Sequence, residues 1–126
     1  MDSDAQSFLI KLEKVYRKHP EYKREAFHFI LTALDFTVKR LKKPRHVTGQ
    51  ELCCGIRDYA LDQFGILAKT VFHHWGITET FDFGKIVFHL IDGELMGKTA
   101  EDSVEDFRDV YSFEEAFDNA EINYDI

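Results

Sequence analysis

Histidine and cysteine side chains in the middle of the chain are its first candidates for chemistry. His73 and His74 are adjacent, His89 follows one predicted helix later, and Cys53 and Cys54 are the only cysteines. Imidazole and thiolate are ligands that zinc prefers in a tetrahedral site. The spacing argues against such a site, because the chain has no C-x-x-C, H-x-x-x-H or H-E-x-x-H pattern. The sequence therefore predicts no metal site and no cofactor.

The two cysteines are also candidates for covalent catalysis. A nucleophilic thiol needs a neighbouring base or cation that lowers its pKa. Arg57 lies four residues after Cys53, one helical turn away. A buried free cysteine that packs as a small apolar side chain is the commoner case. We therefore predict no catalytic residue and interpret the protein as non-enzymatic.

Charged residues interrupt the apolar pattern of two neighbouring predicted helices. Arg57 and Asp58 interrupt one helix, and Lys69 with Thr70 interrupts the next. Together they could form a polar patch between the helices. A solvated face with ordinary ion pairs, each worth less than about 1 kcal/mol, explains the same pattern and is the favoured interpretation. Arg57, Asp58 and Lys69 remain candidate binding residues.

The strongest surface signal is a run of basic residues between the second and third predicted helices. Cations near the C-terminal end of a helix are favoured by its dipole, which gives the run a structural explanation. The functional explanation is a patch that contacts phosphate groups. The net charge of −7 argues against a nucleic-acid module. The basic run consists of Lys39, Arg40, Lys42, Lys43, Arg45 and His46.

The charge of the chain changes sign along its length. Residues 1–46 hold 11 Lys and Arg against 6 Asp and Glu, residues 47–100 hold 4 against 7, and residues 101–126 hold 1 against 10. Such segregation predicts either a basic contact surface or neutralisation of one part of the fold by another. The sequence leaves open which of these holds for the basic run.

Composition is typical of one globular domain spanning residues 1–126. Apolar residues make up 44% and charged residues 31% of the chain, and the 12 phenylalanines predict an aromatic core. No apolar run is long enough to span a membrane. The acidic, polar N-terminus does not resemble a signal peptide, and adjacent cysteines are poorly placed to bridge. These features favour a cytoplasmic protein.

Apolar residues recur at helical spacing over most of the chain. Pro20 and Pro44 end the first two helices, and Gly65 and Gly76 can take the positive φ of a C-terminal cap. Thr48 and Glu51 predict a capping box, Thr78 or Thr80 is expected to cap a later helix, and Gly55 in mid-helix suggests either a close crossing or a tolerated weak position. The predicted helices span residues 4–19, 21–42, 48–65, 66–75 and 81–92.

Between residues 94 and 111 the helical period gives way to alternation. Leu95–Met96 and Phe107–Tyr111 predict a short antiparallel β-hairpin. A second capping box, Ser112 with Glu115, predicts a short helix over 113–119, and residues 120–126 are expected to fray. The predicted fold is thus mainly α, with about five helices and a C-terminal hairpin. This order resembles a winged-helix module, and a helical bundle with an appendage explains the sequence nearly as well.

Four stretches within residues 46–118 carry a family resemblance. They read HVTGQELCCGIRDYALDQFG, AKTVFHHWGI, DFGKIVFHLI and ELMGKTAEDSVEDFRDVYSFEEAF, and together they cover more than half of the chain. They resemble a family of short, uncharacterised bacterial proteins of the type restricted to the Verrucomicrobia and Planctomycetes. The resemblance implies a bacterial cytoplasmic protein, and it implies no cofactor or catalytic residue.

These observations favour a non-enzymatic module that binds another protein through its charge-segregated surface. The alternative is a nucleic-acid- or ribosome-associated module that uses the basic run. No membrane partner is expected, and the sequence leaves the oligomeric state open.

Overall fold

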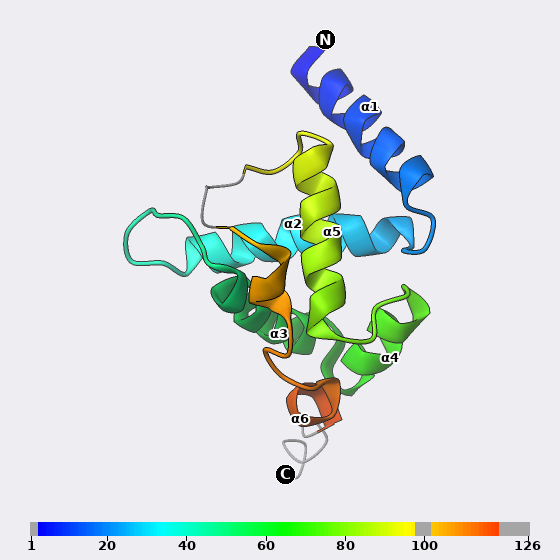
Figure 1. Cartoon of the computed structure of the whole chain (residues 1–126). Coiled ribbons are helices and arrows are strands. Elements are labelled where there is room, and N and C mark those ends of the chain that lie inside the picture. Colours follow the sequence, from blue (N-terminus) through cyan, green and yellow to red (C-terminus); the bar gives the residue numbers. More distant parts are fainter. Residues whose placement is uncertain (1–2, 98–101, 119–126) are drawn as a thin grey trace.

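The computed structural model, which describes residues 3–97 and 102–118, is mainly helical as predicted. Helices α2, α3 and α5 form its centre, and α1 extends away from them at one end (Figure 1). The 3-10 turn η2 packs on α5 and α3, and helix α6 packs on α4 and α3. The elements are α1 (Ser3–Lys18), α2 (Arg24–Lys39), α3 (Gly49–Phe64), η1 (Gly65–Leu67), α4 (Ala68–His74), α5 (Thr80–Asp92), η2 (Val104–Phe107) and α6 (Phe113–Phe117).

Phe72 of α4 lies at the centre of an aromatic cluster that joins four helices. Its ring centroid is 5.2 to 6.0 Å from the centroids of five other rings. Aromatic pairs at such distances stabilise a fold by about 0.5–1.5 kcal/mol each beyond the burial of their area. The phenylalanines predicted to form an aromatic core thus pack against one another around Phe72. The five partners are Phe29, Trp75, Phe83, Phe113 and Phe117.

Close contacts at two glycines bring the central elements together. A Cβ atom on Gly55 would lie 1.8 Å from Thr37 Oγ1, so α2 and α3 cross where α3 has no side chain. A Cβ atom on Gly84 would lie 2.7 Å from the Cβ of Phe107, which fixes η2 against α5. Of the two explanations offered for Gly55, the close crossing is confirmed.

The helix ends confirm most of the predicted caps. Thr48 and Glu51 form the predicted capping box at the start of α3. Gly65 and Gly76 take positive φ values of 54° and 91° where α3 and α4 end. The cap predicted for α5 is wrong, because this helix begins at Thr80 after Glu79. The buried Thr80 hydroxyl instead donates to the carbonyl oxygen of Phe107 at 2.6 Å and so holds η2 on α5.

The second helix is shorter than predicted, and the fourth is divided. Residues 21–23 form a turn because the Lys23 amide donates to the Trp75 carbonyl oxygen at 3.2 Å, and α2 therefore begins only at Arg24. The segment predicted as one helix over 66–75 consists of η1 and α4. The end of the last predicted helix at residue 119 and the expected fraying of 120–126 lie outside the described residues.

The predicted β-hairpin is wrong wherever the structure describes the chain between 94 and 111. Residues 94–97 and 102–111 contain no strand, and Val104–Phe107 forms a 3-10 turn. The Ser103 hydroxyl accepts from the Glu105 amide at 3.1 Å, and this local bond favours a helical turn. Phe107 is buried against Gly84, and a positive φ of 52° at Asp109 turns the chain. Without strands in these segments the winged-helix resemblance loses its support.

Candidate functional site

The basic run surrounds the loop between α2 and α3, and most of its cations contact carboxylates. Three of the four carboxylate partners belong to α2 and α3, and only Asp102 belongs to the acidic C-terminal segment. The adjoining helices therefore neutralise most of the basic run. Lys42 and Lys43 are exposed and form no ion pair with a described residue. The nitrogen–oxygen contacts are Lys39–Asp35 at 2.8 Å, Arg40–Asp58 at 3.0 Å, Arg45–Glu51 at 2.7 Å and His46–Asp102 at 2.8 Å.

The candidate polar patch divides between two sets of partners. Arg57 Nε lies 3.0 Å from Asp58 Oδ1, and Asp58 also pairs with Arg40 at the end of α2. Lys69 Nζ lies 2.7 Å from Asp118 Oδ1, just after α6. Lys69 therefore pairs with the C-terminal segment rather than with the Arg57–Asp58 pair. Such arrangements match the favoured interpretation of ordinary ion pairs.

The cysteines and the neighbouring histidines do not assemble into a reactive centre. Cys53 is fully buried in α3, and burial raises the pKa of its thiol. Arg57 pairs with Asp58 instead of activating this thiol. His73 and His74 are exposed on α4, whereas His89 lies on α5 and faces α1. Burial thus makes Cys53 a packing residue, as its commoner role suggests.

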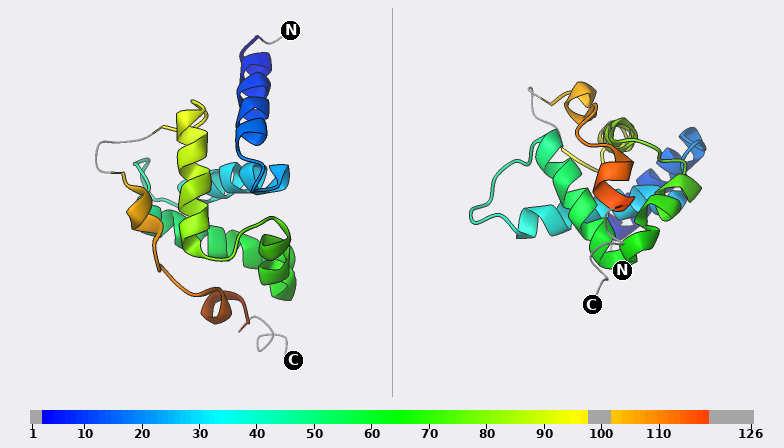
Figure 2. Two further views of the ribbon diagram at one scale, coloured as in Figure 1. Left: turned by 45° about the vertical axis from the view of Figure 1, so that its right-hand side comes forward. Right: turned by 90° about the horizontal axis from the view of Figure 1, so that it is seen from below.

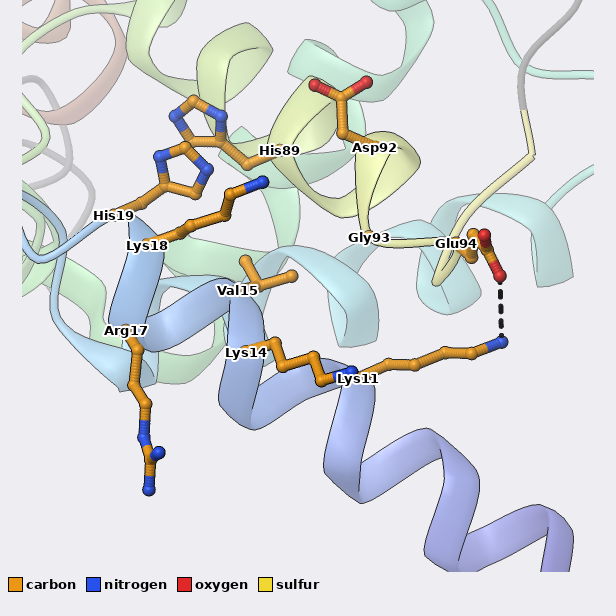
Figure 3. A pocket seen from close by; sticks show the side chains of 10 residues that line it. All are labelled: Lys11, Lys14, Val15, Arg17, Lys18, His19, His89, Asp92, Gly93 and Glu94. Atoms are coloured by element: carbon orange, nitrogen blue, oxygen red, sulfur yellow. Dashed lines mark ion pairs between the residues drawn. The ribbon is translucent and has the colours of Figure 1, made fainter.

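A groove of about 640 Å³ lies between α1 and the C-terminal end of α5 (Figure 3). Helical spacing places three lysines of α1 along it, because residues three and four apart share a face. α1 comes close enough because Gly93 has no side chain: a Cβ atom there would lie 2.5 Å from Val15 Cγ2. The titratable residues that line the groove are Lys11, Lys14, Arg17, Lys18, His19, His89, Asp92 and Glu94.

Two stacked imidazoles and a carboxylate lie at the end of this groove. The ring centroids of His19 and His89 are 3.4 Å apart, and their planes differ by 8°. Glu21 Oε2 lies 3.7 Å from His19 Nδ1 and 3.5 Å from His89 Nε2. Burial, with the neighbouring His19, lowers the pKa of His89 and so favours the neutral imidazole over the protonated one. In the described part of the chain, His19, Glu21 and His89 are the side chains whose ligand atoms lie close enough together to hold a metal ion.

Helix α1 is buried at one end and uncovered at the other. Leu12 and Val15 pack into the body, with 6% and 3% of their surface exposed. One turn earlier, Phe8, Leu9 and Ile10 are 42%, 62% and 58% exposed. The N-terminal half of α1 extends past the other helices in Figure 1 and in the left view of Figure 2. The apolar stripe that fixes α1 to the body therefore continues onto a helical segment that no described residue covers.

The structure gives His89 the partners His19 and Glu21 rather than His73 and His74. The signal for the group found here was the H-x-E spacing of His19 and Glu21 directly after the first helix. His89 is a partner only because α1 packs across the end of α5, which the sequence pattern does not specify. Phe8 and Leu9 share the helical apolar spacing of Leu12 and Val15, so the sequence does not distinguish the uncovered pair from the buried one.

Comparisons with protein-family models, curated proteins and solved structures found no match. The resemblance of residues 46–118 to a bacterial family therefore stays a prediction. Within the described ranges, no helix combines the length and apolarity needed to cross a membrane.

Proposed function

We propose that the protein is a non-enzymatic binding module that holds another protein chain on the uncovered half of α1. The observation that carries the proposal is the exposed pair Phe8 and Leu9, which continues the buried stripe of Leu12 and Val15 on the same helix, with the exposed Ile10 beside it. Contiguous exposed apolar residues on a soluble protein are typical of interaction sites. A helix that presents such a face is a common element of protein recognition.

The charge around this stretch indicates the chemistry of the partner. Lys14 and Lys18 follow the exposed stretch towards the C-terminal end of α1, line the groove there and form no ion pair with a described residue, whereas Lys11 pairs with Glu94 at 3.3 Å. A partner that buries the apolar stripe and extends along α1 into the groove would meet these ammonium groups. The arrangement favours a partner segment with an apolar face bordered by Asp or Glu, since complementary charges increase specificity and association rate.

Substitution of Leu9 by glutamate tests this proposal. Tagged wild-type protein should capture a specific acidic partner from a cell lysate, and Leu9→Glu should reduce the yield at least tenfold because a charge would enter an apolar contact. Leu67→Glu is the matched control, since Leu67 is 58% exposed and lies in η1, outside α1. Circular dichroism should show equal helicity for both variants.

The remaining outcomes of this experiment distinguish other functions. Equal capture by the Leu9→Glu and Leu67→Glu variants would contradict the proposal. The same holds if wild-type protein captures no protein but sediments with anionic vesicles, because a basic amphipathic helix can also bind a membrane surface. If the double variant Lys14→Glu, Lys18→Glu captures the partner as well as wild-type protein does, the partner does not need acidic residues. The apolar contact with α1 would still stand.

A nucleic-acid- or ribosome-associated role is the second candidate, and Lys42 with Lys43 supports it. Both side chains are exposed in one loop without an ion pair to the described residues. Phosphate contacts weaken steeply between about 50 and 200 mM salt. Fluorescence anisotropy with an RNA oligonucleotide should show this dependence, and Lys42→Glu with Lys43→Glu should abolish the signal. A flat titration at low salt would exclude this role.

A further inference from the structure

We propose that His19, Glu21 and His89 bind a divalent transition-metal ion, with zinc as the best match, where the α1–α2 turn meets α5. The inference is independent of the partner proposed for α1. It rests on three donor groups of the right chemistry that the fold brings together from distant parts of the chain. Their candidate ligand atoms all lie within 4.8 Å of one another.

The donor set agrees with zinc chemistry. Two imidazole nitrogens and one carboxylate oxygen are accepted by zinc, and sites with three protein ligands keep the fourth position open. Bond lengths of about 2.0–2.1 Å place tetrahedral ligand atoms about 3.3 Å apart. The distances from Glu21 Oε2 to His19 Nδ1 and to His89 Nε2 are 3.7 and 3.5 Å. The carboxylate therefore needs only a small movement to share an ion with each ring.

Binding requires the two rings to turn out of their stack. A ligated metal lies close to the plane of each imidazole, and parallel rings 3.4 Å apart cannot both contain it. His19 and Glu21 flank Pro20 after the end of α1, so their side chains can adjust more easily than that of His89 in the middle of α5's last turns. The Glu21 side chain is 54% exposed, which leaves it free to rotate.

The groove provides for the open fourth position. Lys14 and Lys18 line the same groove as the two histidines, and Figure 3 shows the Lys18 side chain beside the imidazole pair. Ammonium groups that line the same groove favour an anionic fourth ligand, such as chloride or hydroxide, over a neutral one. They also repel a bare cation, so the site should bind more weakly than a closed structural zinc site.

An ion at this position would connect α1 to the body of the protein. His89 belongs to α5, whereas His19 and Glu21 belong to the turn that follows α1, so one ion joins the two. Because a ligand that binds only the folded state stabilises it, zinc at about 100 times its Kd should raise the melting temperature by several degrees.

Titration of the reduced, metal-free full chain with zinc sulfate tests the proposal. Isothermal titration calorimetry should give one site per chain, and cobalt as a substitute should give the visible absorption of tetrahedral coordination. His89→Ala and Glu21→Gln should each weaken binding at least about tenfold, the smaller effect seen even for outer-shell partners. His74→Ala is the control, because His74 is an exposed histidine on another helix and should bind zinc as the wild type does.

Glu21→Gln keeps the test valid if His89→Ala fails to fold, because the exposed Glu21 side chain contributes little to packing. Binding that is unchanged in Glu21→Gln and in a folded histidine variant would overturn the proposal. So would the absence of one-to-one binding at millimolar zinc, or cobalt spectra of octahedral, water-rich coordination.

Discussion

Replacing Gly55 by alanine would place a methyl group inside the contact between α2 and α3. The new Cβ atom would lie 1.8 Å from Thr37 Oγ1 and 2.9 Å from Thr37 Cβ. Rotation of the Thr37 hydroxyl relieves the first contact but breaks its 2.7 Å hydrogen bond to the Ala33 carbonyl oxygen. The second contact involves an atom that cannot rotate away, so the helices must separate by about half an ångström.

The expected loss follows from three contributions. Overpacking of this kind costs about 1–3 kcal/mol, and a lost buried hydrogen bond costs about 1 kcal/mol. Alanine gains about 1 kcal/mol over glycine in helix propensity. Gly55→Ala should therefore lower the free energy of unfolding by about 1–3 kcal/mol, a large share of the 5–15 kcal/mol typical of a domain.

Urea unfolding followed by circular dichroism measures this change. Gly97→Ala is the control, because a Cβ atom there meets nothing within 4 Å and should change stability by less than about 0.5 kcal/mol. Thr37→Ala removes the hydroxyl and methyl groups, so the double variant should be less destabilised than the sum of the single variants by about 1 kcal/mol. A stable Gly55→Ala variant, or strict additivity with Thr37→Ala, would refute the close crossing as the reason for the glycine.

Three further predictions concern buried and paired groups. Tyr22→Phe should cost about 1.5–3 kcal/mol in urea unfolding, because the hydroxyl donates to the buried Asp82 carboxylate at 2.5 Å. Cys53 is buried and its pKa is raised, whereas Cys54 is partly exposed. Ellman's reagent should therefore modify only Cys54 in the folded chain and both thiols in urea. The Arg45 guanidinium lowers the pKa of Glu51 to about 2. The Arg45–Glu51 pair should therefore stabilise the fold above pH 4.5, by under about 1 kcal/mol because the pair is exposed, and this stabilisation should be lost as the pH falls towards 2. Urea unfolding of Glu51→Gln across this pH range should show that the pH dependence is gone.

Local signals in the sequence predicted the helices and most of their ends. Thr48, Gly65 and Gly76 act within one turn of the backbone, and each has the predicted role. The β-hairpin prediction failed because alternation over five residues does not distinguish a strand from a 3-10 turn that buries Phe107 and is followed by the partly buried Tyr111. What decided the outcome was the hydroxyl of Thr80, which lies in another helix and binds the carbonyl oxygen of Phe107.

The candidate sites depended on packing between distant segments, and the sequence predicted them less well. The basic run is visible in the sequence as a cluster of charges, but its carboxylate partners lie on α2, on α3 and at Asp102, and the sequence pattern does not specify those pairs. His19 and His89 meet only because Gly93 lets Val15 approach the end of α5. No periodicity within either segment contains that information.

The single tryptophan also determines what optical measurements will report. Trp75 lies among aromatic rings of the core, with its centroid 5.4 Å from that of Phe29, 5.8 Å from Phe64 and 6.0 Å from Phe72. Its emission should follow the melting of this ring cluster, while detachment of α1 should leave the signal almost unchanged. A fluorophore attached near Phe8 would therefore reveal a separate, earlier transition if the first helix opens independently of the rest.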